Sequence, residues 1–209
     1  MRRKKLSALL AVFAILGTNS GITAFSAEEA VSGSWHGLDW SLENHILTIS
    51  GNQEIYCCTD TFPDDDMLAI PDWKEYSDEI YEIVIEEGVT GAEEHALAEY
   101  PNLKKITLPE SFVFLAPWAL ADNPELTEIS GLEHVKELNY RCLSNTGYIA
   151  ENPFVIEDSI LYYAEGTELT VPDGVTEIAP FAFGNLTGED YINYSNSDTT
   201  DRRLHQHDG

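Results

Sequence analysis

A cluster of aspartates is the first group of side chains that could bind a ligand, since carboxylate oxygens are the donors that Ca²⁺ prefers. Asp60, Asp64, Asp65 and Asp66 lie close together, with Asp72 further along the chain. Calcium-binding loops place their acids on alternate positions and turn at a glycine, and residues 61–66 have neither feature. A solvated acidic loop is therefore the favoured interpretation, and a calcium site is the alternative.

Other combinations that could perform chemistry are incomplete. His95 and Glu99 are four residues apart, so a helix would bring them to one face as half of a metal site, but no third ligand is near. Cys57 and Cys58 are adjacent and Cys142 is distant, which fits neither a disulfide framework nor a compact metal site, although one bridge to Cys142 is possible. With no nucleophile elbow and no phosphate-binding loop, the sequence predicts no catalytic residue, no cofactor, no metal and no enzyme activity.

The charge of the chain restricts its partners. Its 209 residues include 11 Lys and Arg against 37 Asp and Glu, a net charge of −26. Nucleic-acid binding depends on cations that neutralise phosphates, so this class of function is excluded, and docking onto an anionic membrane is disfavoured. A hydrophobic content of 43% is ordinary for a globular protein of this length.

The first 26 residues have the pattern of an export signal. Four basic residues at positions 2–5 precede an apolar run over residues 6–17, and small residues follow before the first acids. The apolar run is shorter than the roughly 20 residues that a membrane-spanning helix needs. Cleavage after Ser26 would leave seven basic residues and a net charge of −30. We therefore predict a secreted or cell-surface protein, without membrane insertion after cleavage and without an anchor in this chain.

An apolar pattern that recurs every 23 residues sets the fold. Three copies share it: Ile80-x-x-Ile83-x-Ile85, Leu103-x-x-Ile106-x-Leu108 and Leu126-x-x-Ile129-x-Gly131. A fourth copy, at residues 169–178, follows an insertion at residues 147–168. Each copy predicts a short strand with one apolar face, and the period is typical of leucine-rich repeats, whose units stack into one core. The predicted fold is an α/β-type repeat solenoid, mainly β, in which a right-handed coil of about four units covers residues 80–186.

The same copies place an alanine or a cysteine at one buried position. Ala96, Ala119 and Cys142 follow one another at the 23-residue period. Cys142 is therefore predicted to be a small core side chain rather than a reactive thiol.

The repeat unit resembles the BspA-type leucine-rich repeat. The segment LTVPDGVTEI at residues 169–178, closed by PFAF at residues 180–183, is the best match. Residues 33–51 resemble the segment that often precedes such arrays, and residues 154–161 resemble a strand insertion that they often carry. The resemblance covers residues 33–186. It implies a bacterial secreted or surface protein involved in adhesion and protein binding, with no shared catalytic residues.

The two ends of the array differ. Residues 27–79 are predicted to form an N-terminal β cap and the acidic loop, with a hairpin around residues 43–45 and with Trp35, Trp40 and Trp73 in the cap core. Residues 187–209 are polar and contain no further full unit. This tail is either disordered or a truncated repeat, and in the latter case the chain is a shortened member of a longer protein.

The outward positions of the strands form the candidate ligand face. Glu82, Lys105 and Glu128 share one slot in three consecutive units, where they should form an acid–base–acid row across parallel strands. The next slot is occupied by Val84, Thr107, Ser130 and, in the fourth copy, Thr170.

Two functions agree with this pattern. The first is a monomeric adhesion or recognition module that binds an extracellular protein or glycan through the strand face. The second is a spacer, or a fragment of a larger surface protein, with no ligand of its own.

Overall fold

The computed structural model describes residues 30–56, 70–166, 168–180, 182–183 and 191–194. The expected export signal, the pair Cys57 and Cys58, and the aspartates between residues 60 and 66 lie outside the described residues. Within them the chain is mainly β, with one short α-helix, α1 (Gly147–Glu151), and two 3₁₀ helices, η1 (Asp72–Glu79) and η2 (Leu132–His134). None of the described helices is long and apolar enough to cross a membrane.

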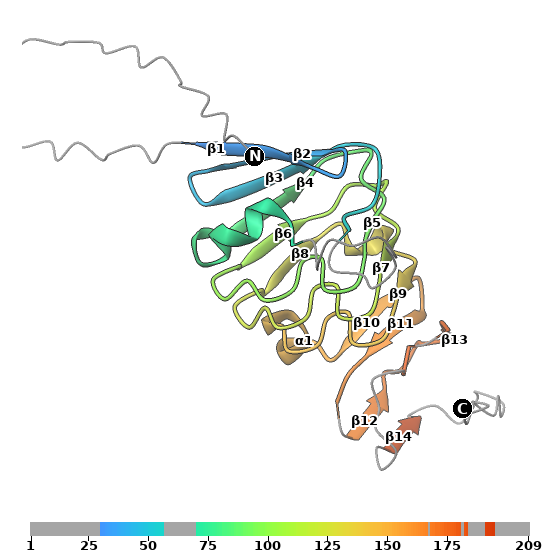
Figure 1. Cartoon of the computed structure of the whole chain (residues 1–209). Coiled ribbons are helices and arrows are strands. Elements are labelled where there is room, and N and C mark those ends of the chain that lie inside the picture. Colours follow the sequence, from blue (N-terminus) through green and yellow to red (C-terminus); the bar gives the residue numbers. More distant parts are fainter. Residues whose placement is uncertain (1–29, 57–69, 167, 181, 184–190, 195–209) are drawn as a thin grey trace, which may run out of the picture.

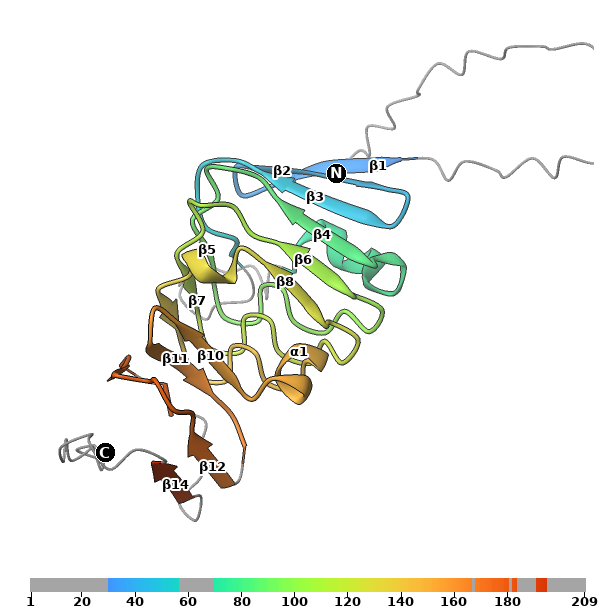
Figure 2. The same cartoon turned by 180° about the vertical axis from the view of Figure 1, so that it is seen from behind.

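The largest sheet has six strands in the order β1-β2-β3-β4-β6-β8 (Figure 1). Its first three strands, β1 (Val31–Trp35), β2 (Leu38–Glu43) and β3 (Ile46–Ser50), are antiparallel, and β2 and β3 form the hairpin expected around residues 43–45. From β3 onward the pairing is parallel, through β4 (Glu82–Ile85), β6 (Lys105–Thr107) and β8 (Glu128–Ser130). Figure 2 shows these parallel strands stacked below the hairpin.

Strands of successive units pair with partners exactly one repeat apart. Glu82 lies opposite Lys105, and Lys105 lies opposite Glu128, so the offset is 23 residues at each step. A second, three-stranded sheet of β5 (Gly91–Ala92), β7 (Phe114–Leu115) and β9 (Glu137–Leu138) has the same offset. Each unit therefore contributes one strand to each of two sheets.

The core lies between the two sheets and is filled by the recurring apolar positions. Ile83 and Ile106 have no solvent exposure, and Ile129 has 9%. The small position is also buried, and the free thiol of Cys142 lies there with no exposure, as expected. At the N-terminal end Trp73 is buried and makes edge-to-face contacts with both Trp35 and Trp40. The tryptophans therefore pack in and against the core, as the sequence predicted.

The third copy lacks its last apolar residue because the backbone is left-handed there. Gly131 has a φ of +86°, and a Cβ at this position would lie 2.2 Å from the carbonyl oxygen of Leu108. Only glycine fits this close contact between two units.

The segment that contains His95 and Glu99 is a corner of the coil, which corrects the idea that a helix aligns these residues. Both have a positive φ, of 58° and 62°, so their side chains do not share a helical face. The equivalent residues of the next two units are also left-handed: Trp118, Asp122, Arg141 and Asn145. Two left-handed residues thus shape the same corner in each of three units.

After β8 the insertion redirects the chain. It contains α1 and the antiparallel hairpin of β10 (Phe154–Glu157) and β11 (Ile160–Ala164), and β11 pairs in parallel with β13 (Glu177–Ile178). The fourth repeat strand, β12 (Glu168–Val171), pairs not with β8 but with β14 (Tyr191–Tyr194).

The pairing of β12 with β14 gives structure to part of the polar tail. The two strands are parallel, and Glu168 lies opposite Tyr191, again 23 residues later. Residues 191–194 are therefore a strand at the repeat period, in a segment where the sequence pattern showed no full unit.

Candidate binding face

The outward side chains of the six-stranded sheet form an acid–base row at its centre. Lys105 Nζ lies 3.6 Å from Glu82 Oε1 and 3.4 Å from Glu128 Oε1. The three side chains are 37%, 30% and 60% exposed, respectively, so a partner can reach all of them. Both carboxylates, Glu128 more than Glu82, raise the pKa of the Lys105 ammonium, which keeps its charge at any physiological pH.

The row continues beyond the repeat strands. Glu82 pairs with Ile46 on β3, and Ile46 pairs with Glu43 on β2. Ile46 is one of the few exposed large hydrophobic residues. The row therefore carries charges on both sides of an apolar side chain.

A second row of mostly hydroxyl side chains crosses all six strands, two residues further along each strand of the parallel part. We call it the hydroxyl row; its members are Ser32, Ser41, Thr48, Val84, Thr107 and Ser130. All six are at least partly exposed. Because the side chains are short, the face above this row is flat and presents hydrogen-bond donors and acceptors at strand spacing.

The structure brings together six of the seven residues that the sequence placed on this face. Thr170 is the exception and a correction, because β12 belongs to a separate two-stranded sheet. The α-helix and hairpin of the insertion lie between β8 and β12 in the chain, so the fourth strand does not continue the first three.

The extension of the face onto β1–β3 was missed. Its signal was present, because residues 38–42 and 46–50 alternate apolar and polar, and the polar set must then face away from the core. An assignment of the hairpin to a cap alone does not join its outward residues to the row of the repeats.

A group of rings lies on the corners of successive units. The His95 ring stacks on Trp118 at 5.6 Å with an interplanar angle of 3°, and Tyr140 meets Trp118 edge to face at 5.1 Å. The Arg141 guanidinium lies 5.3 Å from the Tyr140 ring centre. The His95 ring therefore packs against an aromatic partner. In the described part of the chain, no three His, Cys, Asp or Glu side chains lie close enough together to hold a metal ion.

Burial explains the environment of the thiol. Desolvation raises the pKa of Cys142 well above its usual range, so the reactive thiolate is not formed at neutral pH.

The repeat geometry agrees with the comparison with known families. The model of the BspA type leucine rich repeat region matches residues 75–154 and 154–202, in six copies. The chain belongs to this family of leucine-rich repeat proteins. No curated protein matches it.

Three solved structures are similar to the chain. A leucine-rich repeat protein from Eubacterium ventriosum shares 20% identity, with a TM-score of 0.45 over 78% of this chain and 59% of the other. The pneumococcal vaccine antigen PcpA shares 14% (TM-score 0.28; 81% and 51% covered), and a leucine rich cell surface protein from Faecalibacterium prausnitzii shares 12% (TM-score 0.24; 80% and 55% covered). The chain spans about half to three fifths of the length of these proteins.

Proposed function

We propose that this protein is an exported, non-enzymatic recognition module that binds an extracellular protein or glycan through the acid–base row and the hydroxyl row. The observation that carries the proposal is the register of the parallel strands. It aligns Glu82, Lys105 and Glu128 with one another and joins them to a flat hydroxyl row that spans six strands. The pattern of the first 26 residues and the membership in the repeat family support export.

The same proposal includes the finer features of the fold. We propose that the coil of the repeats is right-handed and that β1–β3 cap its first unit. The pairing of β3 with β4 supports the cap, because it carries the hydroxyl row from the hairpin onto the array.

The charges favour a partner with basic groups next to hydrogen-bonding groups. Acidic side chains outnumber basic ones on the face as in the whole chain, whose net charge is −26. Such a surface speeds association with basic partners, and the effect falls as salt increases.

The test is a binding screen of the purified exported protein against arrayed extracellular proteins and glycans at low and moderate salt. We expect a saturable hit that weakens with salt and weakens further in Glu82→Lys. Glu137→Lys is the matched control, since Glu137 is exposed but belongs to the second sheet. A folded protein that binds nothing would favour the alternative of a structural spacer or fragment. Equal losses of affinity in Glu82→Lys and Glu137→Lys would show that the ligand does not bind at this face.

A further inference from the structure

Among the residues that the structure describes, the six-stranded sheet ends at β8, which pairs with β6 on one side only. The amide of Glu128 donates to the Lys104 carbonyl (3.2 Å), and the carbonyl of Ser130 accepts from the Leu108 amide (2.9 Å), so both residues face β6. In an extended chain the backbone groups of consecutive residues point to opposite sides. The N–H and C=O of Ile129, between them, therefore point to the open edge.

A second open edge belongs to the hairpin of the insertion. In its three-stranded sheet, β11 pairs with both β10 and β13, and β10 is the outer strand. Ile129 of β8 and residues 154–157 of β10 line the same cleft, which has a volume of about 280 Å³. The cleft thus lies between two strands that are each at the edge of a sheet in the described part of the chain.

Most of the residues that line the cleft are apolar by type, although polar atoms make up most of the surface they expose there, and the charged ones are acidic. Its residues are Ile129, Leu132, Glu133, Val135, Tyr148, Asn152, Phe154, Val155, Ile156, Glu157 and Tyr162. The two charged residues of this lining are Glu133 and Glu157. Ile156 is 37% exposed, so an apolar side chain is available at the rim.

The wall formed by the hairpin is linked to the repeat array by partly buried hydrogen bonds. Tyr163 Oη donates to Glu165 Oε2 at 2.5 Å, and Ser144 Oγ donates to the same carboxylate at 2.8 Å. Tyr163 has no solvent exposure. These bonds hold the hairpin against the array, and a wall held in place lowers the ordering cost of binding.

We propose that the cleft between β8 and β10 binds an extended peptide segment of a partner protein by β-strand addition, and that this segment alternates apolar and basic residues. Its backbone would pair with the outward-facing N–H and C=O of Ile129, and alternate side chains would enter the cleft. The remaining side chains would lie at the rim, where Glu133 and Glu157 favour Lys or Arg.

The carboxylate of Glu133 places a negative charge at the cleft. It is 54% exposed and lies 3.6 Å from Nε2 of His134, and it adds to the burial that raises the pKa of the Tyr148 phenol. A basic side chain of the peptide would replace solvent around this carboxylate. An added strand would lie beside Glu128 and Ser130 of the strand face, but the cleft is lined by Glu133 and Glu157 and not by Glu82. Weaker peptide binding in Glu133→Lys therefore tests this proposal, and weaker ligand binding in Glu82→Lys tests the proposed function.

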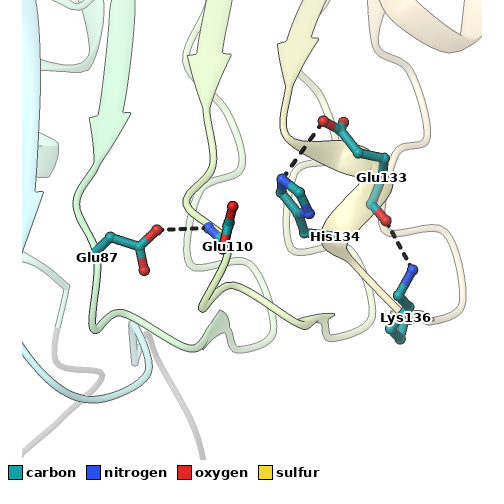
Figure 3. A network of polar contacts seen from close by, with 5 residues as sticks. All are labelled: Glu87, Glu110, Glu133, His134 and Lys136. Carbon is teal, nitrogen blue, oxygen red and sulfur yellow. Dashed lines mark hydrogen bonds and ion pairs between the residues drawn. The ribbon is translucent and has the colours of Figure 1, made fainter.

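The chain offers a matched control for Glu133. Glu87, Glu110 and Glu133 occupy the same position in three consecutive units (Figure 3), and Glu110 lies outside the lining of the cleft. Glu110 and Glu133 are both exposed. Glu110→Lys therefore changes the net charge by the same amount as Glu133→Lys, at the equivalent position of the preceding unit, and leaves the cleft unchanged.

The experiment measures the Kd of a synthetic peptide, acetyl-Lys-Val-Lys-Val-Lys-Val-Lys-amide, on the full exported protein, together with hydrogen exchange of the Ile129 amide. We expect saturable binding, slower exchange at Ile129 in the complex, and about five- to tenfold weaker binding by Glu133→Lys with no change in Glu110→Lys. A peptide N-methylated at alternate residues should not bind, since it cannot pair with a strand edge. The proposal is wrong if no peptide binds, if the acidic Glu-Val counterpart binds as well, or if Ile129 exchange is unchanged in the unmodified complex.

Discussion

The amide of Tyr100 donates a 2.7 Å hydrogen bond to Oδ1 of Asn123, which occupies the equivalent position in the next unit. Nδ2 of Asn123 donates to the carbonyls of Leu97 (2.9 Å) and Leu120 (2.7 Å). Asn123 has no solvent exposure, so one buried amide satisfies three backbone groups of two adjacent coils.

Replacing this amide should destabilise the array. We expect Asn123→Ala to lower the free energy of unfolding by about 2–4 kcal/mol, because buried backbone groups lose their partners. Asn123→Asp keeps the size and the acceptor but removes both donors, and should also be clearly destabilising. Urea unfolding measures both. Asn102→Ala, which removes an exposed hydrogen bond to the Asp78 carbonyl, is the control and should cost less than about 1 kcal/mol. A similar small cost at Asn123 would contradict this account.

The left-handed corner at Glu99 offers a stabilising substitution. Glu99 has a φ of 62°, whereas the equivalent residues are Asp122 and Asn145, types that tolerate this conformation better. Glu99→Asn should raise the free energy of unfolding by about 0.5–1 kcal/mol. Thermal denaturation compares it with Glu94→Asn, an exposed position where φ is not positive, and that control should gain nothing.

Glu93 should make stability depend on pH. Burial, and next the neighbouring carboxylate of Glu54, raise the pKa of Glu93 above its ordinary value. A raised carboxyl pKa favours the folded state below the unfolded pKa of about 4.3, and this contribution is lost as the pH rises through the folded value. Glu93→Gln should therefore gain in Tm over the unmodified protein as the pH is raised from about 4 to 7.

The partner of Glu93 provides the check on this pH effect. Glu54→Gln removes one cause of the shift, so the Tm difference between Glu93→Gln and its parent should vary less with pH in that background. A difference that is constant with pH in the unmodified background would contradict the assignment.

Cys142 should be inert while the protein is folded. Its thiol is fully buried and its pKa is raised by desolvation. Iodoacetamide at about pH 8 should label Cys142 only after unfolding, as read by peptide mass mapping. Cys142→Ala should fold, because Ala119 fills the same position of the preceding unit without exposure. Rapid labelling of the native protein would contradict burial.

The parts of the fold that repeat could be predicted, because each copy reports the same strand independently. The row of Glu82, Lys105 and Glu128 needed only a period and an alternation, and the strands pair as that pattern requires. The placement of Thr170 on the same face was wrong, because the partner of its strand depends on long-range packing of the insertion. The local alternation of apolar and polar residues carries no information about that packing.

Other features depend on tertiary structure alone. The cleft exists because a hairpin docks beside the last strand of a sheet, and no residue type signals that arrangement. The left-handed backbone of His95, Trp118 and Arg141 was equally hidden, since none of these residues is a usual former of that conformation except, to a limited degree, histidine.

At the corner formed by His95, Trp118 and Arg141, the backbone keeps one shape while the side-chain chemistry varies. An imidazole, an indole and a guanidinium occupy one backbone position in three units, which hydrogen bonds between neighbouring coils hold in place, such as those from Leu97 to Ala119 and from Leu120 to Cys142. The side chain can therefore be exchanged without changing the corner. This side of the protein therefore has equivalent positions about 4.8 Å apart on neighbouring units. A single substitution at one of them can change what the surface binds.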